Sequence, residues 1–104
     1  MLRPHVEALK AVLQKTGEDR LSGMVENALS GSEQDLAAFL ISNELWGGAG
    51  SIADEAGCQK GRAAQKLIEA TLIKLGEQQI QEGTVNERTV MWVDTFRQWQ
   101  RYGI

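Results

Sequence analysis

Residue types that carry out covalent chemistry are scarce in this chain, which holds a single cysteine, Cys58, and a single histidine, His5. A nucleophile needs a base beside it, and these two residues lie far apart in the sequence, so no nucleophile–base pair is indicated. We expect Cys58 to be a small buried apolar group and His5 to lie on the surface. One cysteine also excludes an intrachain disulfide, and one of each type excludes a structural zinc site made of cysteine and histidine alone.

Three close pairs of carboxylates are the next candidates for chemistry, since general acid–base catalysis needs two carboxyl groups facing one cleft. Each pair lies at the expected start of a helix, where the helix dipole favours negative charge. A di-metal bundle site would need a Glu-x-x-His motif, and the chain has none. The sequence thus predicts no catalytic residue, no metal site and no cofactor, and favours a protein that is not an enzyme. The pairs are Glu18–Asp19, Glu33–Asp35 and Asp54–Glu55.

The most unusual segment is Glu44–Asp54, which reads Glu-Leu-Trp-Gly-Gly-Ala-Gly-Ser-Ile-Ala-Asp. Glycine-rich backbone that leads into a helix can direct several N–H groups at a phosphate. The segment lacks the Gly-Lys-Ser/Thr of a P-loop, however, and no Lys or Arg occurs between Arg20 and Lys60 to offset its own carboxylates. We therefore expect a structural turn in which Gly48 needs a positive φ or close packing. A small-anion or nucleotide site is the alternative.

This segment also resembles a motif of small, mostly bacterial proteins of undefined activity, written Tyr-Gly-Gly-Met-Gly-Ser-Phe-Asn-Asp. The resemblance covers about nine of the 104 residues. It implies a shared helix–turn–helix corner and supplies no catalytic or binding mechanism. The matching residues are Gly47, Gly48, Gly50, Ser51 and Asp54, with Trp46 at the aromatic position.

Charge is distributed unevenly along the chain, whose net charge is −3 at pH 7. Residues 18–44 hold six acidic residues and one basic residue, a local net charge of −5. Such a surface steers association toward a basic protein, although the same charges also suit a solvated helical face. Our candidate partner-binding residues are Glu26, Glu33 and Asp35. Because the chain as a whole is acidic, nucleic-acid binding is not expected.

Aromatic residues Trp92, Phe96 and Trp99 follow helical spacing near the C-terminus, with arginines interleaved. This spacing predicts a stripe that faces the core. The alternative is an aromatic surface for self-association, since aromatic side chains also anchor protein interfaces.

Helices must position all of these residues, because apolar residues recur at helical spacing and period-two alternation is nearly absent. We expect Gly76 to allow close contact between helices, and Val90, Val93, Phe96 and Trp99 to face the core. The expected apolar stripe of residues 62–81 consists of Ala64, Leu67, Ile68, Leu72, Leu75 and Ile80. The first expected helix starts near Leu2, has Pro4 in its first turn and ends at Thr16–Gly17, with Gly17 in the C-terminal capping position. The second is marked by Leu21–Leu29 and stops at Ser30–Gly31, and the third is capped by Ser32 with Asp35 and reaches Trp46. The others are a short helix from Ser51 to near Gly57, Arg62–Gln81, and Glu87–Tyr102 capped by Asn86.

A chain of 104 residues without repeats or linkers predicts one domain, residues 1–104, folded as an irregular antiparallel all-α bundle of about five helices plus one short helix. No apolar run approaches the roughly 18 residues that span a bilayer, and no signal peptide is recognisable, so we expect a cytoplasmic protein without a membrane partner. The favoured function is a small soluble protein-binding module, including the immunity or inhibitor type that holds an acidic face against a basic protein. The first alternative is a homo-oligomeric structural or regulatory subunit, and the second is the small-anion or nucleotide binder at the glycine-rich segment.

Overall fold

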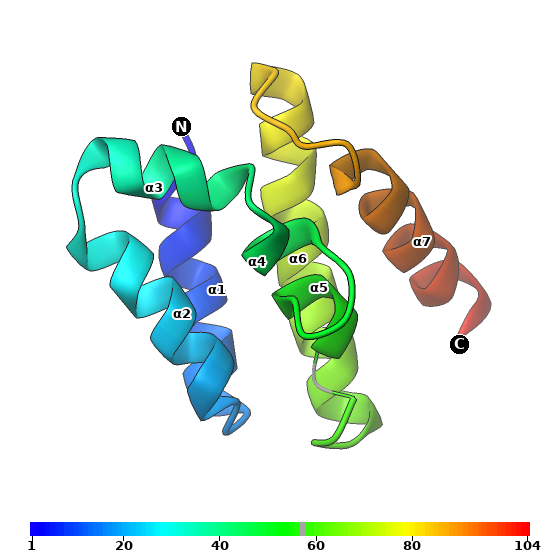
Figure 1. The fold of residues 1–104 in the computed structure, drawn as a ribbon. Coiled ribbons are helices and arrows are strands. Elements are labelled where there is room, and N and C mark those ends of the chain that lie inside the picture. The colour runs from blue at the N-terminus through cyan, green and yellow to red at the C-terminus, as the bar shows by residue number, and fades with distance from the viewer. Residues whose placement is uncertain (57) are drawn as a thin grey trace.

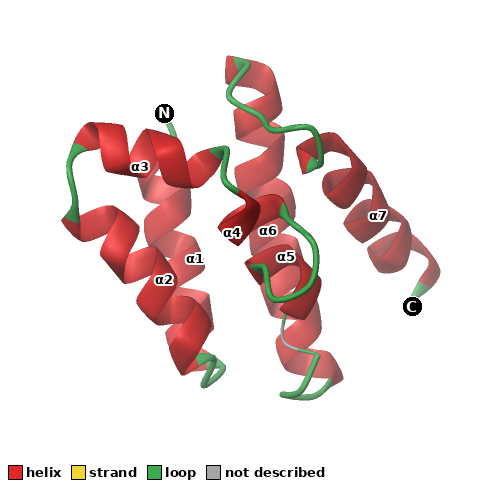
Figure 2. Cartoon of the chain, viewed as in Figure 1, coloured by secondary structure: helices red, strands yellow, loops and turns green. Residues whose placement is uncertain are grey.

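The computed structural model describes residues 1–56 and 58–104, which form helices and connecting loops (Figures 1 and 2). Two single-turn helices, α4 (Asn43–Trp46) and α5 (Ile52–Glu55), lie between longer ones. No strand occurs in the described ranges, so the all-α prediction is confirmed. The five longer helices are α1 (Arg3–Lys15), α2 (Asp19–Ser30), α3 (Glu33–Leu40), α6 (Arg62–Glu82) and α7 (Thr89–Tyr102).

Helix α6 is the centre of the arrangement. It packs against α1 on one side and α7 on the other, and α2 lies beside α1 (Figure 1). Every helix contributes apolar side chains to one core, in which Trp46 and Phe96 are the largest fully buried residues. The predicted irregular bundle with a short helix after the glycines is confirmed, and a second short helix, α4, precedes them.

The first helix begins and ends at the residues that local signals indicate, whereas α2 begins at Asp19, two residues before the expected Leu21. Pro4 lies in the first turn of α1, where its missing N–H breaks no helical hydrogen bond. Gly17 then takes the left-handed conformation, with φ of 79°, and turns the chain back into α2. Val6, Leu9 and Leu13 of α1 are fully buried, as their spacing predicts.

Helix α3 is shorter than expected. Ser32 and Asp35 form the predicted reciprocal cap, in which each side chain accepts a hydrogen bond from the other residue's backbone N–H. The helix was expected to reach Trp46, but it ends at Leu40, and that expectation is wrong. The Ser42 side chain accepts a bond from the Leu45 N–H and opens α4, because a serine hydroxyl offers the backbone an alternative to continuing the helix.

Helix α6 buries its predicted apolar residues only in part. Ile68, Leu72 and Leu75 are fully buried, whereas Leu67 and Ile80, also expected on the buried stripe, are 47% and 38% exposed. The buried face turns toward α1 and α7, and it also carries the polar residues Glu69 and Gln79 into the interior. Gly76 makes the predicted close helix contact, because an added Cβ would lie 2.2 Å from Val93 Cγ2.

Helix α7 begins two residues later than expected, at Thr89. Asn86 does not cap it: its Oδ1 accepts from the Arg88 N–H at 2.7 Å, and its Nδ2 donates to two carbonyl groups at the end of α3 and in α4. Val93 and Phe96 are buried as predicted, whereas Val90 is 48% exposed, so its placement in the core is wrong. The expected end of the short helix near Gly57 lies outside the described residues.

Candidate functional site

The three acidic residues predicted to bind a partner are all exposed, on α2 and α3. The Lys10 ammonium of α1 pairs with the Glu26 carboxylate, and the Ser30 hydroxyl donates to the same carboxylate at 3.2 Å. The Lys10 ammonium and the Ser30 hydroxyl hold the pKa of Glu26 below its usual range. Arg3 of α1 pairs with Glu33 at 3.0 Å. Two of the predicted carboxylates are therefore already neutralised by α1.

The Lys10–Glu26 pair predicts a shift in titration. Lys10→Ala should return the pKa of Glu26 toward its ordinary value, since the main cause of its depression is removed. A carboxylate with a lowered pKa in the folded state stabilises that state above its unfolded pKa, and the contribution is lost as pH falls through the folded pKa. The advantage of the wild-type chain over the variant should thus be present at neutral pH and vanish in acid.

Carboxyl carbon NMR titration of Glu26 checks this shift. Lys15→Ala is the matched control, because Lys15 is exposed at the end of the same helix and makes no ion pair with any described residue. An unchanged Glu26 pKa in Lys10→Ala would contradict the ion pair.

Asp35, the third predicted residue, lies at a cleft of about 320 Å³ between α2 and the α3–α4 segment. Ala28 and Phe39 are 8% and 6% exposed and form its apolar floor. Asp35 and Glu44 are exposed at its rim. The cleft is lined by Met24, Asn27, Ala28, Asp35, Ala38, Phe39, Ser42 and Glu44.

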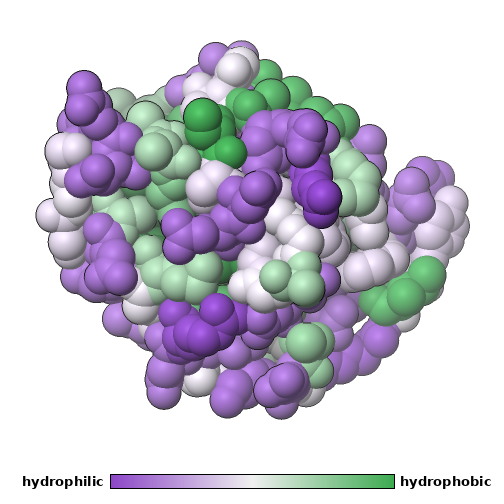
Figure 3. All heavy atoms as spheres, viewed as in Figure 1, coloured by the Kyte–Doolittle hydropathy of each residue, from purple (hydrophilic) through white to green (hydrophobic). Residues whose placement is uncertain are grey.

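A second hollow, of about 440 Å³, continues the cleft toward the glycine-rich segment. Met24 and Glu44 line both hollows, so the two adjoin each other along α2, and we call them together the α2–α4 groove. Figure 3 shows this face of the molecule, where hydrophilic side chains are interleaved with pale green, more apolar ones. The second hollow is lined by Arg20, Met24, Asn43, Glu44, Ala49, Gly50 and Ser51.

The electrostatics of the groove are acidic on the α3–α4 side. Neither Asp35 nor Glu44 takes part in an ion pair within the described part of the chain. The nearest cation along the sequence, Arg20, pairs with Glu55 and donates to the Gly50 carbonyl at 3.2 Å, so its charge is offset. The groove therefore presents carboxylates above an apolar floor.

The glycine-rich corner, residues 46–54, is built by hydrogen bonds of its own. Ser51 Oγ accepts from the Asp54 N–H at 3.0 Å and donates to the Gly47 carbonyl at 3.1 Å, and the Gly50 N–H donates to Asp54 Oδ2 at 3.3 Å. Trp46 is fully buried beneath it. With two backbone donors directed at its own side chains and Asp54 beside them, the corner favours the structural interpretation over an anion cradle.

Gly48 does not have the positive φ that we expected. The left-handed residue of the corner is Gly50, with φ of 87°, and the crowded one is Gly47, where a Cβ would lie 2.0 Å from the Asn43 carbonyl oxygen. At Gly48 the nearest atom would be Arg88 Nη1 at 3.2 Å, the end of a flexible side chain. The positions of the corner that require glycine are therefore Gly47 and Gly50, and not Gly48.

Substitutions at adjacent glycines test this assignment. Gly47→Ala should lower the free energy of unfolding by about 1–3 kcal/mol, since backbone must move to admit the methyl group. Gly48→Ala, the matched control, should change it by less than about 0.5 kcal/mol, because the Arg88 side chain can move. Thermal melting of the two variants separates them, and equal melting temperatures would contradict the assignment.

Polar groups from three elements hold the corner against α6. Trp46 Nε1 donates to Gln79 Oε1 at 2.8 Å, and Gln79 Nε2 donates to the carbonyl groups of Leu40 at 2.8 Å and Thr84 at 2.9 Å. Trp92 Nε1 donates to the Gly47 carbonyl at 3.1 Å. Gln79 is fully buried and was missed in the sequence, where its only signal was a polar residue at helical spacing from Leu72 and Leu75.

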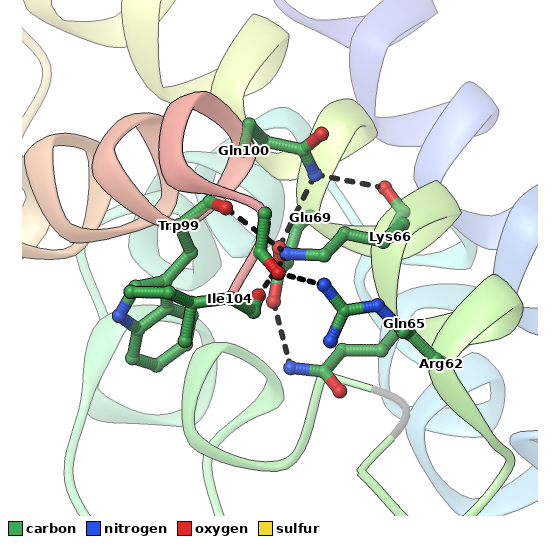
Figure 4. A network of polar contacts seen from close by, with 8 residues as sticks. Arg62, Gln65, Lys66, Glu69, Trp99, Gln100 and Ile104 are labelled. Carbon is green, nitrogen blue, oxygen red and sulfur yellow. Dashed lines mark hydrogen bonds and ion pairs between the residues drawn. The ribbon is translucent and has the colours of Figure 1, made fainter.

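The one fully buried carboxylate of the described residues, Glu69, lies between α6 and α7 (Figure 4). It accepts hydrogen bonds from Gln65 at 2.9 Å, from Lys66 at 3.1 Å and from Gln100 at 3.2 Å. Lys66 also contacts the Trp99 carbonyl at 3.4 Å. Each oxygen of this carboxylate accepts at least one hydrogen bond, and the bond from Gln100 joins α7 to α6.

The predicted aromatic stripe faces the core. Phe96 is fully buried, its ring centroid lying 5.3 Å from that of Trp92 and 5.8 Å from that of Trp99, and both tryptophans are partly buried against the core. Cys58 is exposed, so its expected burial is wrong, because it lies in the loop between α5 and α6 and not on a helix face. His5 is half-buried.

Residues 1–56 and 58–104 bring together no cluster of three or more His, Cys, Asp or Glu side chains able to hold a metal ion. None of the helices described has both the length and the apolar character needed to cross a bilayer. Comparisons with protein-family models, with curated proteins and with solved structures find no match.

Proposed function

We propose that this protein is a binding module that holds a cationic segment of another protein in the α2–α4 groove. The observation that carries the proposal is the position of two exposed carboxylates, Asp35 and Glu44, at the rim of a cleft whose floor is Phe39. No Lys or Arg occurs between Arg20 and Lys60, so the chain supplies no cation of its own from α3 to α5. A partner's cations complement this rim.

Fewer carboxylates are available to a partner than the acidic composition of residues 18–44 predicts. Glu26 and Glu33 pair with cations of α1 and contribute less to the field seen by a partner. Charge complementarity raises the association rate and the selectivity more than the affinity, since exposed ion pairs are weak. The proposed module therefore uses Asp35 and Glu44 to attract the partner and the apolar floor to retain it.

Charge reversal at the groove tests the proposal. The probe is a synthetic amphipathic peptide with lysines on one helical face and leucines on the other, followed by fluorescence anisotropy over a range of salt concentrations. Glu44→Lys should slow association of the peptide, weaken its binding about three- to tenfold and flatten its salt dependence, because one of the two rim carboxylates becomes a cation.

The matched control is Glu87→Lys, which makes the same change in net charge outside the groove. Glu87 is exposed in the loop before α7, and none of the described ion pairs includes it. Its variant should bind the peptide as the wild-type chain does. Equal binding by both variants would show that the acidic side of the molecule is only a solvated surface.

A further inference from the structure

We infer that the groove recognises a cationic amphipathic helix, with one apolar side chain entering between Met24 and Phe39 and cations one turn away facing Asp35 and Glu44. The inference rests on the proposed function and goes beyond it, because a rim of carboxylates alone would accept any lysine-rich segment. The shape and composition of the cleft favour an amphipathic helix over a lysine-rich segment without an apolar face.

The cleft has room for an apolar side chain because its walls carry small residues. The space of about 320 Å³ is lined by Ala28 of α2 and by Ala38 and Phe39 of α3, together with the polar residues at its rim. Met24 is half-buried at the edge, and its unbranched thioether can adapt to different guests. An apolar side chain buried here gains the usual transfer free energy, which a purely polar chain cannot.

The form of the groove suits a helix better than an extended strand. Strand addition needs an open sheet edge, and no strand occurs over the ranges that the structure describes. The groove follows α2 from Arg20 to Ala28, nine residues whose Cα atoms span about 12 Å along the helix axis, or roughly two turns. A docked helix of similar length presents residues at i, i+3 or i+4, and i+7 to such a groove.

The charges on the groove set where the partner's cations must lie. The two carboxylates that take part in no ion pair within the described ranges, Asp35 and Glu44, are on the α3–α4 side, although one oxygen of Asp35 also accepts the Ser32 N–H at 2.9 Å. On the α2 side, Arg20 is engaged by Glu55. A helix whose apolar stripe enters the cleft therefore needs its cations along one flank of that stripe. A peptide with the same residues in random order would not place an apolar side chain in the cleft and cations beside the two carboxylates at the same time.

The test compares two peptides of identical composition. One is the lysine–leucine amphipathic helix, and the other has the same residues scrambled so that no apolar face forms. Wild-type protein should bind the amphipathic peptide at least about tenfold more tightly, since burial of one leucine corresponds to about that factor. Equal affinity for the two peptides would overturn the inference.

Filling the cleft is the complementary change. Ala38→Trp, at an exposed helical position lining the cleft, should reduce affinity for the amphipathic peptide about tenfold and leave the scrambled peptide unaffected. Ala8→Trp, at an exposed position of α1, is the control and should bind as the wild-type chain does. The peptide comparison requires no folding of a variant, so it decides the inference even where Ala38→Trp perturbs the protein.

The two proposals fail in different ways. If binding depends on salt and on Glu44 but not on Ala38 or on the peptide's apolar face, the inference is wrong and the proposed function stands. If neither peptide binds in a manner that depends on Glu44, the proposed function is wrong and the inference falls with it.

Discussion

Gln79→Leu should lower the free energy of unfolding by about 3 kcal/mol, since buried polar groups left without partners cost about 1–3 kcal/mol each. Gln79 is fully buried and bonds Trp46 Nε1, the Leu40 carbonyl and the Thr84 carbonyl. Leucine is of similar size, so the loss comes from the orphaned indole N–H and Leu40 carbonyl. The half-buried Thr84 can turn toward water.

Gln81→Leu is the control for this change. Gln81 lies two residues further along the same helix and is exposed, so its replacement should alter stability by less than about 0.5 kcal/mol. Urea unfolding of both variants gives the comparison. A loss below about 1 kcal/mol in Gln79→Leu would contradict the assignment of Gln79 as the residue that joins α3, α4 and the loop after α6.

Gly76→Ala should destabilise the fold by about 1–2 kcal/mol, because overpacking typically costs about 1–3 kcal/mol and the gain in helix propensity returns part of it. A Cβ at Gly76 would lie 2.2 Å from Val93 Cγ2 and 3.2 Å from Trp46 Cη2. Val93 has a stiff branched side chain, and the Trp46 indole is fixed by its bond to Gln79, so neither can withdraw easily.

The matched control for Gly76→Ala is Gly23→Ala. Gly23 lies in the interior of α2, where an added Cβ meets nothing within 4 Å. The same substitution should there raise stability by about 0.5–1 kcal/mol through helix propensity alone. Opposite signs for the two variants in thermal melting are expected. A stabilising effect at Gly76 would mean that α6 and α7 do not approach as closely as the structure places them.

Elements that local signals control could be predicted from the sequence. Pro4 and Gly17 bound α1, and Ser32 with Asp35 begins α3, because caps and positive-φ glycines act within four residues of one another. The close approach at Gly76 was also predictable, since a glycine inside an otherwise regular helix indicates a neighbouring helix.

Features that depend on tertiary contacts could not be predicted. The break between α3 and α4 at Ser42 is reinforced by Asn86, 44 residues away, whose Nδ2 bonds the Ser42 carbonyl. The burial of Glu69 and Gln79 depends on donors and acceptors from α7 and the loops, which a helical periodicity of apolar residues does not reveal.

The candidate site, too, could be predicted from the sequence only in part. Residues 18–44 were identified by composition, and Asp35 does lie at the groove. The pairing of Glu26 and Glu33 with α1 was not visible, because Lys10 and Arg3 are distant in sequence. Met24 and Glu44 carry no motif, and only the packing of α2 against α3 and α4 brings them to one groove.

The most direct test of the proposed function is a titration of isotope-labelled protein with the amphipathic lysine–leucine peptide, followed by backbone amide NMR. The account predicts that the largest chemical-shift changes fall between Arg20 and Ala28 of α2 and between Asp35 and Glu44, with α7 unaffected. Changes concentrated on α7, or spread evenly over the acidic residues of the whole surface, would contradict a binding site in the α2–α4 groove.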